Sequence, residues 1–189
     1  LSVKEYGAPI YITNFVIDGA NQTFGEGTPN GVEITNSDVL LENCAAVRCR
    51  ESGFKFNNSK VVLSRSAYAY RNYDLSSATG RVPETGIGFN IVNSDVSVSA
   101  LVSGTAAQMT TNPLAGDFQA SGDDVVICAS RNYGGIKLDN SRLTGGLQRE
   151  FVTNVNTGSI GACELNTGYG LEANNSYIKL KGLFDFYGS

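Results

Sequence analysis

The sequence contains no histidine, which excludes imidazole-based catalytic triads, His-ligated metals and imidazole acid–base catalysis. It has no apolar run of 18 residues, so no transmembrane helix is expected. Only 17% of its 189 residues are charged, against about 25% in an average globular protein. The net charge of -4 gives no positive field for nucleic acid or an anionic membrane. No Walker-type phosphate motif is present either, and we expect no cofactor.

The chain is rich in glycine, with 22 residues, and 41% of its residues are hydrophobic. This composition favours a globular, turn-rich β protein, and the length suits a single domain over residues 1–189. The first residues are neither a signal peptide nor a start methionine, so we interpret the chain as part of a longer one.

A repeat of the form G-φ-x-φ-x-N-S-x-φ, with φ apolar, runs through most of the chain. Its starts are Gly31, Gly53, Gly88, Gly135 and Gly170, and "PIYITNFVI" from Pro9 is read as a degenerate first copy. Successive starts are 22, 22, 35, 47 and 35 residues apart. A basic unit of 22 residues therefore predicts insertions, which we place at 75–87, 103–120 and 145–161.

The repeat unit predicts short strands joined by a tight corner. The φ-x-φ alternation is that of a strand with one buried face, and Asn at the corner tolerates left-handed backbone. Such a unit buries its apolar face only by stacking on its neighbours. The sequence therefore predicts an all-β parallel solenoid of about six coils, with a corner ladder formed by Asn14, Asn36, Asn58, Asn93, Asn140 and Asn175.

The glycine, the Asn-Ser corner, the 22-residue coil and the Ala-rich third strand resemble the right-handed parallel β-helix proteins of the pectate-lyase-like superfamily. That group includes polysaccharide-degrading enzymes and the tail spikes and tail fibres of bacteriophages. The "AYRNY" phrase is most similar to the phage proteins. The resemblance implies a single right-handed β-helix, a homotrimer, a virion-tail or extracellular location, and loops that contact surface glycans.

Stacking separates structural from functional candidates. One row, Asp38, Lys60, Asp95, Arg142 and Tyr177, alternates in charge, and a second, Glu33, Lys55, Asn90, Lys137 and Glu172, has no adjacent pair of like charges, which suggests two solvated, charge-matched rows. The phrase "RNY" recurs at one phase and marks either a corner Asn or a sugar-binding strip, because Tyr stacks on sugars and Arg pairs with carboxylates. The strip would comprise Tyr68, Tyr70, Arg71, Tyr73, Arg131 and Tyr133.

An enzymatic alternative rests on "SGDDVVICAS" at 121–130, which resembles the Gly-Asp-Asp segment of the polygalacturonases. That resemblance implies an inverting hydrolase in which Asp123 and Asp124 share acid and base roles and Asp95 assists. A lyase on the same fold is a related possibility. The family's His-containing and Arg-Ile-Lys motifs are absent, and "NSD" also occurs in the plain repeat. A purely structural scaffold is the third alternative.

The four cysteines lack the paired C-x-x-C spacing of a zinc site. Cys44 and Cys49 fall in one coil and have no evident catalytic partner. Cys128 and Cys163 each lie seven residues before a repeat glycine, so they are expected on adjacent coils as small buried thiols, with a disulfide left open. No metal site is expected.

Overall fold

The computed structural model describes residues 1–19, 29–70, 72, 86–100, 127–130, 132–147, 159–164, 168–181 and 183–187. Every regular element within these ranges is a β-strand, and no helix among them is long and apolar enough to cross a membrane. The all-β prediction is therefore confirmed. The strands form two sheets, and all pairings between them are parallel.

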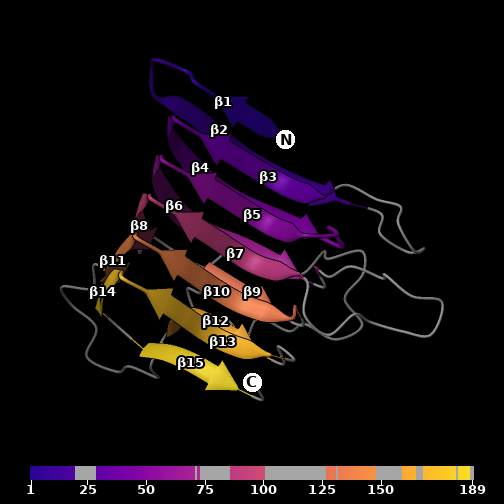
Figure 1. Ribbon diagram of the computed structural model, residues 1–189, viewed down its shortest axis with the longest axis vertical. Coiled ribbons are helices and arrows are strands. Elements are labelled where there is room, and N and C mark those ends of the chain that lie inside the picture. Colours follow the sequence, from indigo (N-terminus) through magenta and orange to yellow (C-terminus); the bar gives the residue numbers. More distant parts are fainter. Residues whose placement is uncertain are drawn as a thin grey trace.

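Sheet A contains every strand that precedes a tight corner, stacked in chain order (Figure 1). Its strands are β1 (Ser2–Lys4), β3 (Asn30–Thr35), β5 (Ser52–Asn57), β7 (Ile87–Val92), β10 (Gly134–Asp139) and β13 (Tyr169–Asn174). Except for β1, these strands hold the G-φ-x-φ stretches of the repeat. The repeat and its phase are thus reproduced by the pairing register, in which Val32 faces Phe54 and Phe54 faces Phe89.

Sheet B contains the strands that follow the corners and three further strands, and it divides at β6. Its members are β2 (Ile10–Asp18), β4 (Asp38–Val47), β6 (Lys60–Tyr70), β8 (Asp95–Ala100), β9 (Ile127–Ser130), β11 (Arg142–Leu147), β12 (Ser159–Glu164), β14 (Tyr177–Lys181) and β15 (Leu183–Tyr187). The first half of β6 pairs with β8, and its second half pairs with β9. We call β8, β11 and β14 the first arm, and β9, β12 and β15 the second arm.

A sheet A strand and the sheet B strand after its corner are called a rung below. The six rungs are β1–β2, β3–β4, β5–β6, β7–β8, β10–β11 and β13–β14. In the rungs that contain β4 and β6, the expected second and third strands are one continuous strand. The register between those two shifts after Glu42, where β6 has one extra residue, and such a bulge bends a strand.

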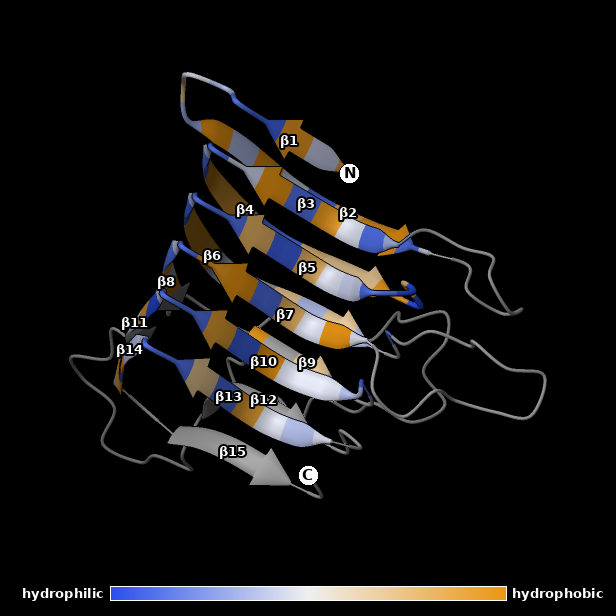
Figure 2. Cartoon of the chain, in the orientation of Figure 1, coloured by the Kyte–Doolittle hydropathy of each residue, from blue (hydrophilic) through white to orange (hydrophobic). Residues whose placement is uncertain are grey.

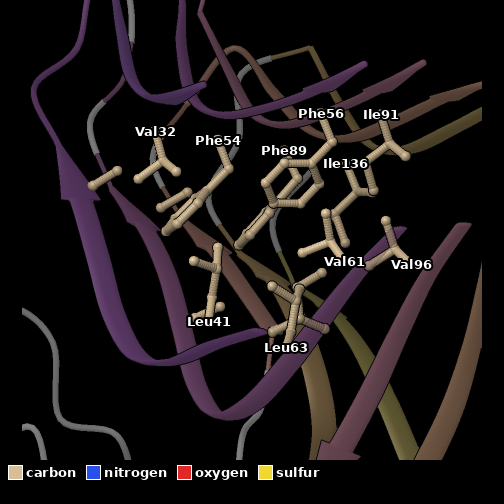
Figure 3. Close-up of a cluster of buried hydrophobic side chains, with 14 of the residues drawn as sticks. Val32, Leu41, Phe54, Phe56, Val61, Leu63, Phe89, Ile91, Val96 and Ile136 are labelled. Carbon is tan, nitrogen blue, oxygen red and sulfur yellow. The ribbon is translucent and has the colours of Figure 1, made fainter. Parts of the chain in front are cut away.

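The core lies between the sheets and is built from stacked rows of one residue per rung. Val32, Phe54, Phe89 and Ile136 form one row, and Val39, Val61, Val96 and Leu143 form another, all at most 4% exposed. The rings of Phe54 and Phe89 stack with centroids 4.7 Å apart and an interplanar angle of 4° (Figure 3). Hydrophobic and hydrophilic residues alternate along the strands of sheet A (Figure 2), and the hydrophobic members of this alternation in β3, β5, β7 and β10 are buried.

Two of the predicted insertions need corrected limits. Ile87 belongs to β7, so the first interval ends before it. Gly145 is part of β11, and Ser159 begins β12, so 145–161 is too long for the third. The predicted insertion at 103–120 lies outside the described residues. The repeat pattern does not reveal these limits because apolar alternation is weak in "RLTGGL" and "SIGACE".

Candidate functional site

The Asn-Ser corner joins sheet A to sheet B in the last five rungs. Its asparagines all have left-handed backbone, with φ between 46° and 51°, namely Asn36, Asn58, Asn93, Asn140 and Asn175. The Nδ2 of Asn58 donates to Oδ1 of Asn36 at 2.7 Å, and Asn175 donates likewise to Asn140 at 2.6 Å. For these five residues the structure supports the predicted ladder, because each occupies the same corner and two neighbouring pairs are bonded side chain to side chain.

Asn14 does not belong to that ladder. It lies within β2, aligned with Asn43 of β4, and Asn43 Nδ2 donates to its Oδ1 at 2.7 Å. The first corner residue is Glu5, with φ 52°, whose N–H bonds the carbonyl of Thr35. The interpretation of the segment from Pro9 as a first copy of the repeat is therefore wrong: this segment follows the first corner instead of preceding it. "IYITN" imitates the repeat, but it pairs with the sheet B strand β4, in a second ladder of two.

The serine after each corner asparagine is a structural residue that the sequence pattern contained but did not explain. Four backbone N–H groups donate to the Oγ of the next serine, at 3.2, 3.1, 3.1 and 3.0 Å, along the series Ser37, Ser59, Ser94, Ser141 and Ser176. Each hydroxyl donates in turn to the carbonyl two residues before it, at 2.7–2.9 Å. A hydroxyl is needed because it accepts and donates at once.

The two "RNY" asparagines form a buried ladder inside the fold. Asn72 and Asn132 are 0% and 1% exposed. Oδ1 of Asn132 accepts from both N and Nδ2 of Asn72, at 2.9 and 3.0 Å. Oδ1 of Asn72 accepts from the N–H of Cys49 at 2.9 Å. The shared phase of the phrase is real, and at its central residue the structural interpretation holds.

The repeat glycines are required by the close approach of the two sheets at this inner ladder. A Cβ on Gly53 would lie 2.7 Å from Nδ2 of Asn72 and 3.0 Å from Cβ of Ala69. A Cβ on Gly88 would lie 2.7 Å from Cβ of Ala129 and 2.6 Å from the carbonyl oxygen of Gly135. Neither glycine has a positive φ. Glycine and the small third-strand alanine are therefore paired requirements of packing.

The predicted sugar-binding strip is only partly a surface. Tyr68 and Tyr70 are 4% and 1% exposed and stack on each other with ring centroids 5.7 Å apart. Almost none of either ring is open to a ligand, so their assignment as surface contacts is wrong in this structure. Both lie outside the main core cluster, and local alternation alone would place them outward. Arg71, Tyr73 and Arg131 lie outside the described residues.

Tyr133, the remaining member of the strip, is half-buried and packs edge-on against Tyr169 of β13, with ring centroids 5.8 Å apart. A Cβ on Gly168 would lie 2.5 Å from the Tyr133 ring, and one on Gly134 would lie 2.4 Å from Tyr169. Each ring thus covers a glycine beside its partner. Burial, with a smaller effect from Glu172, raises the pKa of Tyr169. Tyr169 was missed, and the reciprocal Tyr-Gly and Gly-Tyr dipeptides are the signal that could have found it.

The two charged rows lie in register as predicted. In the strand register Lys60 lies opposite Asp95, and Asp95 lies opposite Arg142. Arg142 lies over the ring of Tyr177 at 5.5 Å from its centroid. In the second row Lys137 contacts Glu172 at 3.2 Å. Asp95 is exposed within the first row, which favours its structural interpretation.

The described residues bring no cluster of metal-ligating side chains together. No group of three or more Cys, Asp and Glu side chains suited to a metal ion occurs among them. Asp123 and Asp124 lie outside the described residues, and their predicted catalytic role remains a prediction. Their place in the chain is shortly before β9, whose first residue, Ile127, is fully buried.

The cysteines of the described side chains are buried free thiols. Cys44 and Cys49 are 0% exposed, and burial raises the pKa of each to about 12. These are the properties of inert packing residues. In the backbone register Cys128 pairs with Ala162, whereas Cys163 pairs with Ala129. The two are thus on adjacent strands but one residue out of register, which corrects the expectation that they stack directly.

The chain turns at three kinds of connection: the Asn-Ser corner, the passage from the first arm to the second, and the return from sheet B to sheet A. The long sequence intervals occur at the second and third of these. Intervals 20–28 and 73–85 connect sheet B back to sheet A, and intervals 101–126 and 148–158 connect the first arm to the second. The Asn-Ser corner takes no insertion in any of the rungs that have it. No protein-family model matches the chain, and neither a curated protein nor a solved structure matches it.

Proposed function

We propose that the chain is a single right-handed parallel β-helix whose coils are the six rungs with their second-arm strands, and that it is a rigid recognition segment of a phage tail fibre or tail spike, or of a similar cell-surface appendage. The observation that carries the proposal is the unbroken serine ladder from Ser37 to Ser176. It bonds every rung from β3–β4 onward to the next one. Right-handed connection of parallel strands is the strong general rule.

The ladder supports a scaffold, and the distribution of the long intervals supports recognition. Rigid β frameworks position variable loops, and binding residues are concentrated on such loops. Here the insertions occur at two corners and leave the ladder corner intact. The ligand class we propose is a surface polysaccharide, contacted by the long intervals together with Arg71, Tyr73 and Arg131. A homotrimer and an extracellular or virion location complete the proposal.

Binding to immobilised bacterial and plant polysaccharides tests this function. We expect Tyr73→Ala or Arg131→Ala to weaken binding about tenfold, equivalent to about 1.4 kcal/mol. Lys60→Ala is the matched control, since Lys60 is exposed on the ladder side of sheet B and should not affect binding. Replacement of 103–120 by a short Gly-Ser linker should weaken binding further. Sedimentation measures whether three chains associate.

Each other result identifies a different function. Release of reducing ends or unsaturated products, lost in Asp123→Asn or Asp124→Asn, would make the chain a polysaccharide hydrolase or lyase. Absence of binding and of cleavage across the panel would leave a structural scaffold. Equal binding by Arg131→Ala, Tyr73→Ala and the unsubstituted chain would remove the proposed contact strip.

A further inference from the structure

The outer face of the first arm carries polar, charged and aromatic side chains. Strands β8, β11 and β14 lie side by side in parallel register (Figure 1). Val96, Leu143 and Ile178 pack in or against the core, so the residues on either side of each point outward. The outward side chains form two rows across these strands, namely Asp95, Arg142 and Tyr177, and Ser97, Thr144 and Lys179.

Arg142 is directed toward an aromatic ring although its other neighbour is a carboxylate. In the register it lies between Asp95 on β8 and Tyr177 on β14. Its Cζ atom lies over the Tyr177 ring, 5.5 Å from the centroid. Among the described residues it forms no ion pair with Asp95 or with any other carboxylate. Stacking on a ring fixes the guanidinium plane and leaves the N–H donors on its edge available to a ligand.

Lys179 is a second unpaired cation beside Arg142. It lies one strand across and two residues along, roughly 8 Å away between Cα atoms at the usual sheet spacings, and it too makes no ion pair within the described part of the chain. Lys4 and Lys137, by contrast, each contact a carboxylate on the adjacent strand. Two neighbouring cations without an anionic contact are notable in a chain of net charge -4, because carboxylates are in excess.

The exposure of this surface is a property of the row along the stack. Every row member from Asp38 to Arg142 is exposed, and Tyr177 continues the row at 49% exposed. The next outward row has the short hydroxyl side chains of Ser97 and Thr144, both half-buried. A hydroxyl both donates and accepts, which suits it to bond the hydroxyl groups of a sugar.

We propose that Arg142, Thr144 and Lys179 form a binding site for the carboxylate-bearing sugars of an acidic polysaccharide. The guanidinium fork of Arg142 binds the carboxylate through two N–H donors, Lys179 adds a second charge, and Thr144 bonds a sugar hydroxyl. Tyr177 is a positioning residue, because it holds the guanidinium and does not itself contact the carboxylate. The inference rests on the proposed function, to which it adds the class of polysaccharide and a contact surface on the first arm.

The probe is polygalacturonate, compared with the same polymer after full methyl esterification, so that the two ligands differ in the charged carboxylate. Titration calorimetry on the full chain at low salt measures the dissociation constants. We expect the ester to bind at least about tenfold more weakly, because it cannot accept charge-assisted hydrogen bonds. Binding of the acidic polymer should weaken at 1 M salt, since exposed charges are screened.

Exposed-site variants locate the binding. Arg142→Ala should weaken binding of polygalacturonate about tenfold and leave binding of the ester unchanged. Tyr177→Leu removes the ring under the guanidinium and should weaken it about threefold, whereas Tyr177→Phe should retain full affinity. Lys60→Ala is the matched control, because it removes an exposed cation from the same row two rungs earlier. Circular dichroism shows that each variant keeps its fold.

The contact strip and the first-arm site can fail separately. Weaker polygalacturonate binding by Tyr73→Ala and Arg131→Ala but not by Arg142→Ala would overturn this inference and leave the proposed function in place. The reverse result would support the inference and remove the contact strip. Equal binding of polymer and ester, or an equal loss in Lys60→Ala and Arg142→Ala, would show that Arg142 does not recognise a carboxylate. Binding of no polysaccharide would overturn both.

Discussion

The N–H of Ser59 donates a hydrogen bond of 3.1 Å to Oγ of Ser94, although 35 residues separate the two in the chain. The hydroxyl of Ser94 simultaneously donates to the carbonyl of Val92 at 2.7 Å. The same pair of hydrogen bonds forms whether the two serines are 22, 35 or 47 residues apart in the chain. The corner is thus the constant part of the fold, and changes in length occur elsewhere.

Removal of one ladder hydroxyl should therefore be costly. Ser94→Ala leaves the buried N–H of Ser59 without an acceptor, and we expect a loss of about 1–3 kcal/mol in the free energy of unfolding. Urea denaturation measures it. Ser97→Ala is the control, since Ser97 is half-buried in the same strand but outside the ladder. Equal stability of the two variants would contradict a structural role for the ladder.

Glycine at the inner approach of the two sheets should be equally sensitive. In Gly88→Ala the new Cβ would meet Ala129 at 2.7 Å and the Gly135 carbonyl at 2.6 Å. Backbone cannot yield as a flexible side chain can, so we expect destabilisation of about 1–3 kcal/mol. Gly7→Ala, with nothing within 4 Å of the added Cβ, should change the melting temperature little. Equal melting temperatures of Gly88→Ala and Gly7→Ala would show that the structure accommodates a Cβ at position 88 without loss of stability.

The repeat could be predicted from the sequence because residues at one phase of every rung do the same job. Strand position, parallel pairing, the corner at Asn36 and the phase of Asn72 with Asn132 all follow from that periodicity. The first rung could not be found this way. Glu5 takes a left-handed φ of 52°, which its residue type does not signal, while Asn14 sits in a matching local pattern on the wrong strand.

The candidate site was less predictable, because exposure depends on what lies over a strand. The outward phase of Tyr68 and Tyr70 is visible in the sequence, but their burial is a tertiary property that alternation does not contain. Tyr169 was overlooked for the related reason that its partner, Tyr133, lies 36 residues earlier in the chain, just before the neighbouring strand β10. The contacts of a ladder residue can be predicted from the repeat, because its neighbours are the equivalent residues of the adjacent repeats.

The register of Asp95 gives a third prediction, which concerns charge. Asp95 lies between Lys60 and Arg142 on adjacent strands, and all three are exposed. Asp95→Lys places three like charges in a row, which should destabilise the fold by about 0.2–1 kcal/mol at low salt. Because exposed charges are screened, the difference should shrink at 1 M salt.

Asp95→Asn is the neutral control for this row and should lie between the unsubstituted chain and Asp95→Lys. Urea midpoints at the two salt concentrations provide the measurement. A defect of Asp95→Lys that does not respond to salt would indicate a steric cause, and the row would then contribute nothing through charge.

The buried thiols predict how stability depends on alkaline pH. Burial raises the pKa of Cys49 from 9.0 to about 12 in the folded chain, because the thiolate would lose its hydration. A group with a raised folded pKa favours the folded state fully below its unfolded pKa, and that contribution is lost as pH rises through the folded value. The free energy of unfolding should therefore fall between about pH 9 and pH 12. Cys49→Ala should have a shallower decline over this window than the unsubstituted chain, measured by urea denaturation at each pH.

A disulfide exchange reagent at pH 8 should react with Cys49 only as fast as the chain opens, and immediate labelling of the folded chain would contradict its burial.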